Sequence, residues 1–90
     1  MPRFLIERII PDLDRRTPEE LRDLARGSNT ILRELGPGIQ WVESYLLRDR
    51  MYCVYIAEDQ ALLREHALRG GFPADQISRV VGRLDPTSGE

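Results

Sequence analysis

The sequence has no lysine, and only one cysteine, one histidine and one tryptophan among its 90 residues. A single cysteine excludes an internal disulfide and fits a reducing compartment. All 13 basic residues are arginine, and the formal net charge is −2. That balance lacks the strong positive charge that nonspecific nucleic-acid binding requires. The exclusive use of arginine fits either a genome-wide composition bias or the anion and stacking chemistry of the guanidinium group.

Long apolar runs and catalytic signatures are also missing. No segment approaches the roughly 18 apolar residues of a membrane-spanning helix, and Glu7 comes too early for the apolar core of a signal peptide. Gly70-Gly71 end an expected helix instead of opening one, so they do not form a phosphate loop. One histidine without a marked serine gives no Ser/His/Asp triad. We therefore expect a cytoplasmic protein with no membrane or nucleic-acid partner, and we lean away from an enzyme.

The hydrophobic pattern predicts one domain over residues 1–90, in the order β-α-β-β-α-β. The first helix has the clearest start, because Thr17 is a suitable N-cap, Pro18 suits the first helical position, and Glu20 completes a capping box. Gly36 ends it. Asp59 is the expected cap of a second helix that runs to about Arg69. Strands are predicted at 4–10, 39–47, 51–57 and 76–85, and residues 86–90 are expected to fray.

This order predicts an α+β, ferredoxin-like fold. Two right-handed crossovers place both helices on one face of a four-stranded antiparallel sheet with strand order 4-1-3-2. The other face has no helix to cover it. An uncovered face that carries aromatic side chains must meet a ligand, another sheet or a partner subunit.

The register of the central hairpin decides which side chains lie on that uncovered face, because a slip of one residue exchanges the two faces. We favour a three-residue turn over residues 48–50, which pairs Tyr45 with Cys53 and Glu43 with Tyr55. A two-residue turn is the alternative. In the favoured register the uncovered face carries Trp41, Glu43, Tyr45, Cys53 and Tyr55, with Leu5, Glu7 and Ile9 from the first strand. The side facing the helices then receives Phe4, Ile6, Val42, Leu46, Tyr52, Val54 and Ile56.

Several of these residues have both a structural and a functional interpretation. Cys53 is either a buried small hydrophobe or a thiolate ligand for zinc, nickel or copper. His66 is either a packed, hydrogen-bonded residue or a metal ligand. In the favoured register these two lie on opposite faces, so they share an ion only near a sheet edge, across a dimer, or if that register is wrong. Glu7 and Glu43 form either an acid/base pair or exposed strand carboxylates.

The aromatic side chains of the hairpin also allow two roles. Trp41, Tyr45 and Tyr55 can line an apolar ligand pocket. They can equally form the hydrophobic centre of a dimer interface, where tryptophan and tyrosine are enriched. The dimer role is the one we favour, and the two roles are compatible.

Beyond these residues, the chain resembles a small bacterial family first catalogued as a domain of unknown function and associated with nickel binding. The resemblance rests on the motifs Trp41-Val42-x-Ser44-Tyr45, Tyr52-Cys53-x-Tyr55-x-Ala57, His66-Ala67-x-x-Gly70-Gly71-Phe72-Pro73-Ala74 and Asp85-Pro86-Thr87. It implies a ferredoxin-like homodimer whose sheets meet face to face as a dimeric α/β-barrel. It also implies metal binding.

The leading hypothesis is a homodimeric metal-binding protein, most simply for nickel, with zinc or copper as alternatives, that acts in sequestration or metal response. The expected ligands are Cys53, His66 and Glu7, with Trp41, Glu43, Tyr45 and Tyr55 shaping the cavity or the dimer face. The alternative is a cofactor-free dimeric α/β-barrel enzyme, monooxygenase- or isomerase-like, that acts on a small aromatic or apolar substrate with His66 or Glu7 as base. A third possibility is a plain interaction module.

Overall fold

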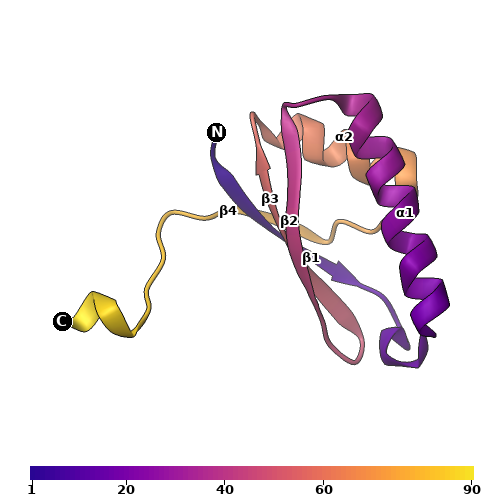
Figure 1. The fold of residues 1–90 in the computed structure, drawn as a ribbon, viewed down its shortest axis with the longest axis horizontal. Coiled ribbons are helices and arrows are strands. Elements are labelled where there is room, and N and C mark those ends of the chain that lie inside the picture. Colours follow the sequence, from indigo (N-terminus) through magenta and orange to yellow (C-terminus); the bar gives the residue numbers. More distant parts are fainter.

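The computed structural model describes residues 1–90 and has one four-stranded sheet and two helices (Figure 1). The strands are β1 (Arg3–Ile9), β2 (Ile39–Leu46), β3 (Arg50–Ala57) and β4 (Gln76–Arg79). The helices are α1 (Pro18–Leu35) and α2 (Gln60–Gly70), with short 3-10 turns at Leu13–Arg15 and Pro86–Gly89. Neither helix combines the length and the apolar composition that a membrane-spanning segment requires.

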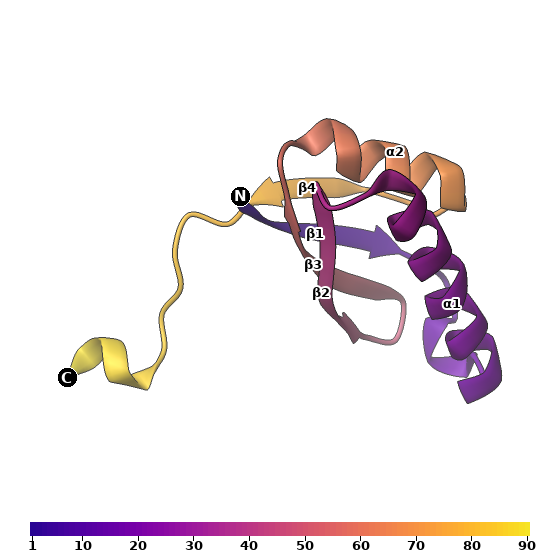
Figure 2. The ribbon, with the colours of Figure 1, turned by 45° about the horizontal axis from the view of Figure 1, so that its top comes forward.

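The sheet is antiparallel throughout, and its strand order is β2-β3-β1-β4. Both helices lie on one side of the sheet, and the other side has no covering element (Figures 1 and 2). This arrangement confirms the α+β, ferredoxin-like prediction, including the order 4-1-3-2. It also leaves β2 and β4 as the two edges of the sheet.

The helix boundaries follow local sequence signals. The Thr17 hydroxyl accepts a hydrogen bond from the Glu20 backbone N–H at 3.1 Å, and the Glu20 carboxylate accepts one from the Thr17 backbone N–H at 3.0 Å. This capping box satisfies two of the N–H groups that a helix start leaves free. In α2 the Asp59 carboxylate accepts from the Leu62 N–H at 3.0 Å, and Gly71 ends the helix with a left-handed φ of 66°. Both predicted helices are thereby confirmed.

The core lies between the helices and one face of the sheet. Phe4 and Ile6 of β1 are buried there, as predicted, whereas Leu5, Glu7 and Ile9 point to the uncovered face. Their neighbours on β3 are Tyr55 and Cys53, because Phe4 pairs with Tyr55 and Ile6 pairs with Cys53. The buried residues of β3 are therefore Met51, Cys53, Tyr55 and Ala57.

The favoured hairpin register is wrong. The turn has two residues, Arg48 and Asp49, closed by a hydrogen bond from the Leu47 N–H to the Arg50 carbonyl at 2.8 Å. Leu46 consequently pairs with Met51, and Ser44 pairs with Cys53. Because the shift is one residue, the faces of β3 are exchanged: Cys53 and Tyr55 lie beneath the helices, and Tyr52, Val54 and Ile56 lie on the uncovered face.

A β-bulge adds a second change to the hairpin. The register shifts between Trp41 and Glu43, so the extra residue is Val42, and Trp41 pairs with Tyr55. Because the bulge inserts one extra residue, Trp41 and Glu43 point to opposite faces, although uninterrupted alternation would put them on the same face. Trp41 and Ser44 therefore share the helix side of β2, where the indole N–H donates to the Ser44 hydroxyl at 2.9 Å. The prediction that Trp41 lies on the uncovered face is wrong; that for Glu43 and Tyr45 is confirmed.

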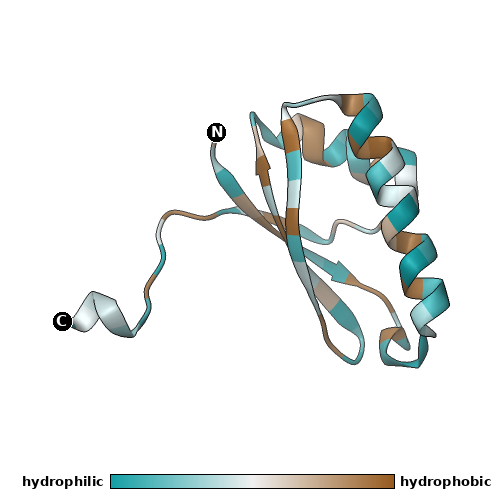
Figure 3. Cartoon of the chain, viewed as in Figure 1, coloured by the Kyte–Doolittle hydropathy of each residue, from teal (hydrophilic) through white to brown (hydrophobic).

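The last strand is shorter than the predicted range of 76–85. Its pairing ends where the Val80 N–H donates to the Arg3 carbonyl at 2.8 Å, because β1 begins at Arg3 and offers no further backbone partner. The chain then runs away from the body as a tail that carries exposed hydrophobic segments (Figure 3). Val81, for example, is 97% exposed.

Candidate functional site

A buried polar cluster lies between the helices and the sheet, centred on His66. The imidazole is fully buried, and its Nε2 lies 3.0 Å from the Ser28 hydroxyl of α1. Its ring packs between the rings of Tyr55, at 5.6 Å between centroids, and Phe72, at 5.3 Å. Nδ1 is buried and has no hydrogen-bond partner. Burial, assisted by the nearby Arg8 cation, lowers the His66 pKa to about 4, so the ring is neutral at physiological pH.

Arg8 is the residue of this cluster that the sequence interpretation missed. Its side chain is 3% exposed, and it donates hydrogen bonds to the Tyr55 hydroxyl at 3.2 Å and to the Pro73 carbonyl. The guanidinium also lies over the rings of Tyr55 and Phe72, at 5.8 and 5.6 Å from their centroids. No carboxylate forms an ion pair with it. The strict alternation of Phe4, Ile6 and Arg8 along one strand was the signal that placed it inward.

Tyr55 joins the arginine to the histidine. Its hydroxyl accepts from Arg8, and its ring contacts His66. Burial raises the pKa of the Tyr55 phenol, and the Arg8 cation opposes that rise without cancelling it. The phenol therefore stays neutral, and it does not offset the positive charge of Arg8.

Beside this cluster a pocket of about 240 Å³ opens between α1 and the sheet. Its walls are mainly apolar and come from α1, from the end of β1, from the edge strand β2, from β3 and from the segment after α2. The polar side chains in its lining are Arg8, Ser28, Ser44, Cys53 and Tyr55, and the apolar ones include Leu24, Ala25, Trp41, Leu46, Met51 and Phe72.

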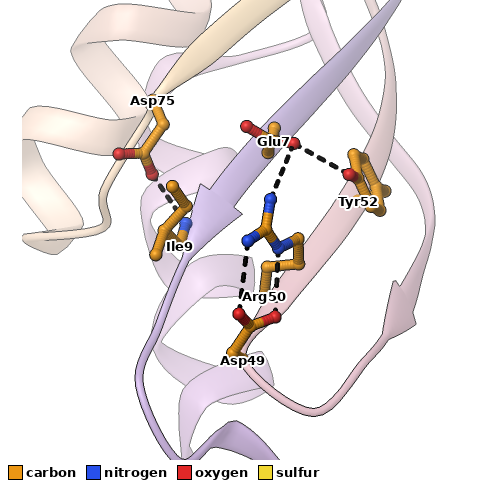
Figure 4. Close-up of polar contacts among 6 residues, drawn as sticks. All are labelled: Glu7, Ile9, Asp49, Arg50, Tyr52 and Asp75. Carbon is orange, nitrogen blue, oxygen red and sulfur yellow. Dashed lines mark hydrogen bonds and ion pairs between the residues drawn. The ribbon is translucent and has the colours of Figure 1, made fainter.

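The uncovered face has a separate polar network (Figure 4). The Tyr52 hydroxyl donates to the Glu7 carboxylate at 2.8 Å, and an Arg50 nitrogen lies 3.5 Å from the same oxygen. Arg50 also pairs with Asp49 at 3.0 Å. Further along the face the Tyr45 hydroxyl donates to Glu43 at 2.8 Å, and this hydrogen bond raises the Tyr45 pKa. Leu5, Val54 and Ile56 provide half-buried apolar surface between these groups.

The structure separates the predicted site residues into two groups. Cys53, His66, Trp41 and Tyr55 lie on the helix side, whereas Glu7, Glu43 and Tyr45 lie on the uncovered face. The expected conflict between Cys53 and His66 is thereby removed, because the corrected register puts both on one side. Glu7 is now the residue that stands apart from them.

The three predicted metal ligands do not fit a single ion within one chain. Glu7 is on the opposite face from Cys53 and His66, and no group of three or more histidine, cysteine, aspartate or glutamate side chains is placed to hold a metal ion. The unpartnered Nδ1 of His66 is a chemically suitable donor. However, the adjacent Arg8 cation disfavours a second positive charge there.

Comparison with known proteins gives two matches. Residues 4–80 match the family model described as the nickel responsive protein SCO4226-like family. The fold is similar to the crystal structure of SCO4226 from Streptomyces coelicolor A3(2), with a TM-score of 0.76 over 91% of this chain and 99% of that chain, at 13% sequence identity. No curated protein matches the chain by sequence.

Proposed function

The chain belongs to the nickel responsive SCO4226-like family, and on that premise we propose that it is a homodimeric nickel-binding protein that sequesters the ion or responds to it. The structural observation that supports this proposal is the uncovered face of the sheet. It combines apolar side chains with the Glu7 and Glu43 carboxylates, and no element of the chain packs on it (Figure 2).

A second copy of the chain is the partner that this face favours. A symmetric dimer brings the same surface together from both subunits, so each carboxylate is presented twice. Burying a carboxylate without a cationic partner is unfavourable. Glu7 pairs with Arg50, but Glu43 has only the neutral Tyr45 hydroxyl, so a cation between the copies would supply the missing positive charge. Since one chain has no group of three or more suitable ligands, a second copy would have to contribute donors to the site.

Glu7 is the ligand that this arrangement favours. Arg50 and Tyr52 orient its carboxylate on the uncovered face. The affinity of a given oxygen or nitrogen site increases from Mn²⁺ to Ni²⁺ and Cu²⁺, so such a site would prefer nickel over the earlier divalent metals. Cys53 and His66 are the less favourable pair, because they are buried beneath the helices and do not face the surface that a second copy would share.

Calorimetric titration of metal-free protein with Ni²⁺, Zn²⁺ and Cu²⁺ tests this proposal. We expect stoichiometric Ni²⁺ binding per dimer that is lost in Glu7→Gln and kept in Glu19→Gln, a matched substitution at an exposed position of α1. Weak, nonstoichiometric binding to the wild-type protein would contradict the function. Loss of binding in the double variant Cys53→Ser/His66→Gln, with Glu7→Gln unaffected, would move the site beneath the helices.

The dimer has its own test, the molar mass in solution by light scattering. Val54→Glu introduces a carboxylate at the centre of the uncovered face, and we expect it to convert the dimer to a monomer. Val81→Glu makes the same substitution in the exposed tail and should leave the dimer intact. A wild-type monomer at micromolar concentration would contradict the homodimer.

The enzyme alternative has less support from the geometry. It requires His66 or Glu7 as a base within an aromatic pocket. Neither residue lines the pocket between α1 and the sheet: Glu7 is on the other face, and His66 lies behind Tyr55 and Phe72. The arrangement therefore favours binding over acid-base catalysis.

A further inference from the structure

Arg8 is a buried cation without an anionic partner. Burying a charge is unfavourable unless the charge is paired. Only two of the five N–H groups that a guanidinium offers make hydrogen bonds within the chain, and both acceptors, the Tyr55 hydroxyl and the Pro73 carbonyl, are neutral. The Tyr55 and Phe72 rings add cation-π attraction but no negative charge. The site therefore lacks one negative charge.

The pocket that Arg8 lines is suited to the body of a small organic molecule. Its volume of about 240 Å³ is slightly below the roughly 300–1,000 Å³ of pockets for drug-sized ligands. Leu24 and Ala25 of α1, Trp41 of β2 and Met51 of β3 give it mostly apolar walls. No other arginine and no acidic side chain lines it. The lining therefore suits an apolar molecule that carries one negative charge.

From the buried guanidinium, its lack of a carboxylate partner and the apolar pocket beside it, we infer that the chain binds a small organic monocarboxylate between α1 and the sheet. The carboxylate would accept hydrogen bonds from Arg8, whose planar fork matches a carboxylate in a bidentate contact. The apolar or aromatic body would lie against Trp41 and Leu24. A strongly hydrated, multiply charged anion such as phosphate is disfavoured by the single cation and the apolar walls.

This pocket is distinct from the nickel site proposed above. The pocket is on the helix side of the sheet, and Glu7 is on the uncovered face. Positive charge at Arg8 favours an anion, so the two faces would select ligands of opposite sign. The carboxylate proposal does not depend on nickel binding, and its test is carried out in the presence of EDTA.

The sole tryptophan provides the readout, because Trp41 lines the pocket. Phenylacetate and its neutral isostere phenylacetamide are titrated into the wild-type protein while Trp41 fluorescence is followed, and calorimetry gives the affinity independently. We expect saturable binding of phenylacetate, with the amide about 10- to 100-fold weaker, since charged hydrogen bonds contribute roughly 1.5–3 kcal/mol.

Two variants test the Arg8 charge and the volume of the pocket separately. Arg8→Gln should remove the preference for the carboxylate over the amide. Ala25→Leu should fill the pocket and weaken both ligands, while it leaves Arg8 in place. Arg22→Gln, on the exposed side of α1, is the matched control for the loss of an arginine and should bind as the wild-type protein does.

Equal affinity for phenylacetate and phenylacetamide, or no saturable binding of either at millimolar concentration, would overturn the proposal. Carboxylate binding that survives in folded Ala25→Leu would also overturn it, because the ligand would then be elsewhere. If Arg8→Gln does not fold, the comparison of the two ligands on the wild-type and Ala25→Leu proteins decides the question without it.

Discussion

The Ser28 hydroxyl and Nε2 of His66 lie 3.0 Å apart in a buried contact that joins α1 to α2. It is the only hydrogen bond of the imidazole, because Nδ1 has no partner. The Ser28 hydroxyl is thus the sole hydrogen-bond partner of the buried His66 ring. It also holds the two helices together above Tyr55 and Arg8.

Removing the Ser28 hydroxyl should destabilise the protein. Ser28→Ala leaves both imidazole nitrogens buried without partners, and an unsatisfied buried polar group costs about 1–3 kcal/mol. We expect a loss of that size in the free energy of unfolding, measured by urea denaturation. Thr30→Ala, at an exposed position two residues along α1, is the control and should change stability by less than about 0.5 kcal/mol. Equal effects of the two substitutions would contradict a stabilising Ser28–His66 contact.

Protonation of His66 should make stability depend on pH in a defined window. Its pKa is about 4 in the folded protein, chiefly because of burial, against an ordinary value of 6.5 in the unfolded chain. Between these values the unfolded chain binds more protons, so stability falls as pH decreases from about 6.5 to about 4 and is unaffected by this group above that range. The shift corresponds to a loss on the order of 3 kcal/mol.

Urea denaturation of the wild-type protein and of His66→Gln across pH 4–8 checks this prediction. The variant lacks the titrating group, so the difference in stability between the two proteins should narrow as pH falls below 6.5. A constant difference over the whole range would show that His66 titrates normally in the folded state.

Two glycines should respond in opposite directions to alanine. A Cβ at Gly70 would collide with the ring of Phe72, whereas a Cβ at Gly27, within α1, would meet no atom. Gly70→Ala should push Phe72 away from His66 and Arg8 and destabilise by about 1–3 kcal/mol. Gly27→Ala should stabilise by about 0.5–1 kcal/mol, because alanine favours the helix. Thermal unfolding of both variants measures the contrast, and a shift of the same sign in each would contradict it.

The inward face of the central hairpin could not be predicted from the sequence. Met51, Cys53 and Tyr55 alternate with Tyr52, Val54 and Ile56, and the two sets are similarly hydrophobic. Alternation establishes that a strand has two faces, but it does not say which face is inward when both are apolar. The metal-ligand prediction placed Cys53 on the wrong face for the same reason.

Arg8 illustrates a different difficulty. Its spacing from Phe4 and Ile6 places it inward, yet a charged residue is normally expected at the surface. Its burial depends on groups that other segments supply. These are the Tyr55 hydroxyl, the Pro73 carbonyl and two aromatic rings. These segments lie far from Arg8 in the chain, so no local pattern reveals them.

The sequence by itself determined the helices, their caps at Thr17 and Asp59, the strand order and the existence of an uncovered face. These features follow from signals within a few residues and from the handedness of the connections. The tertiary structure alone decided the two-residue turn, the bulge at Val42 and the inward face of β3. Those depend on backbone pairing between strands, where a shift of one residue moves every side chain to the opposite face.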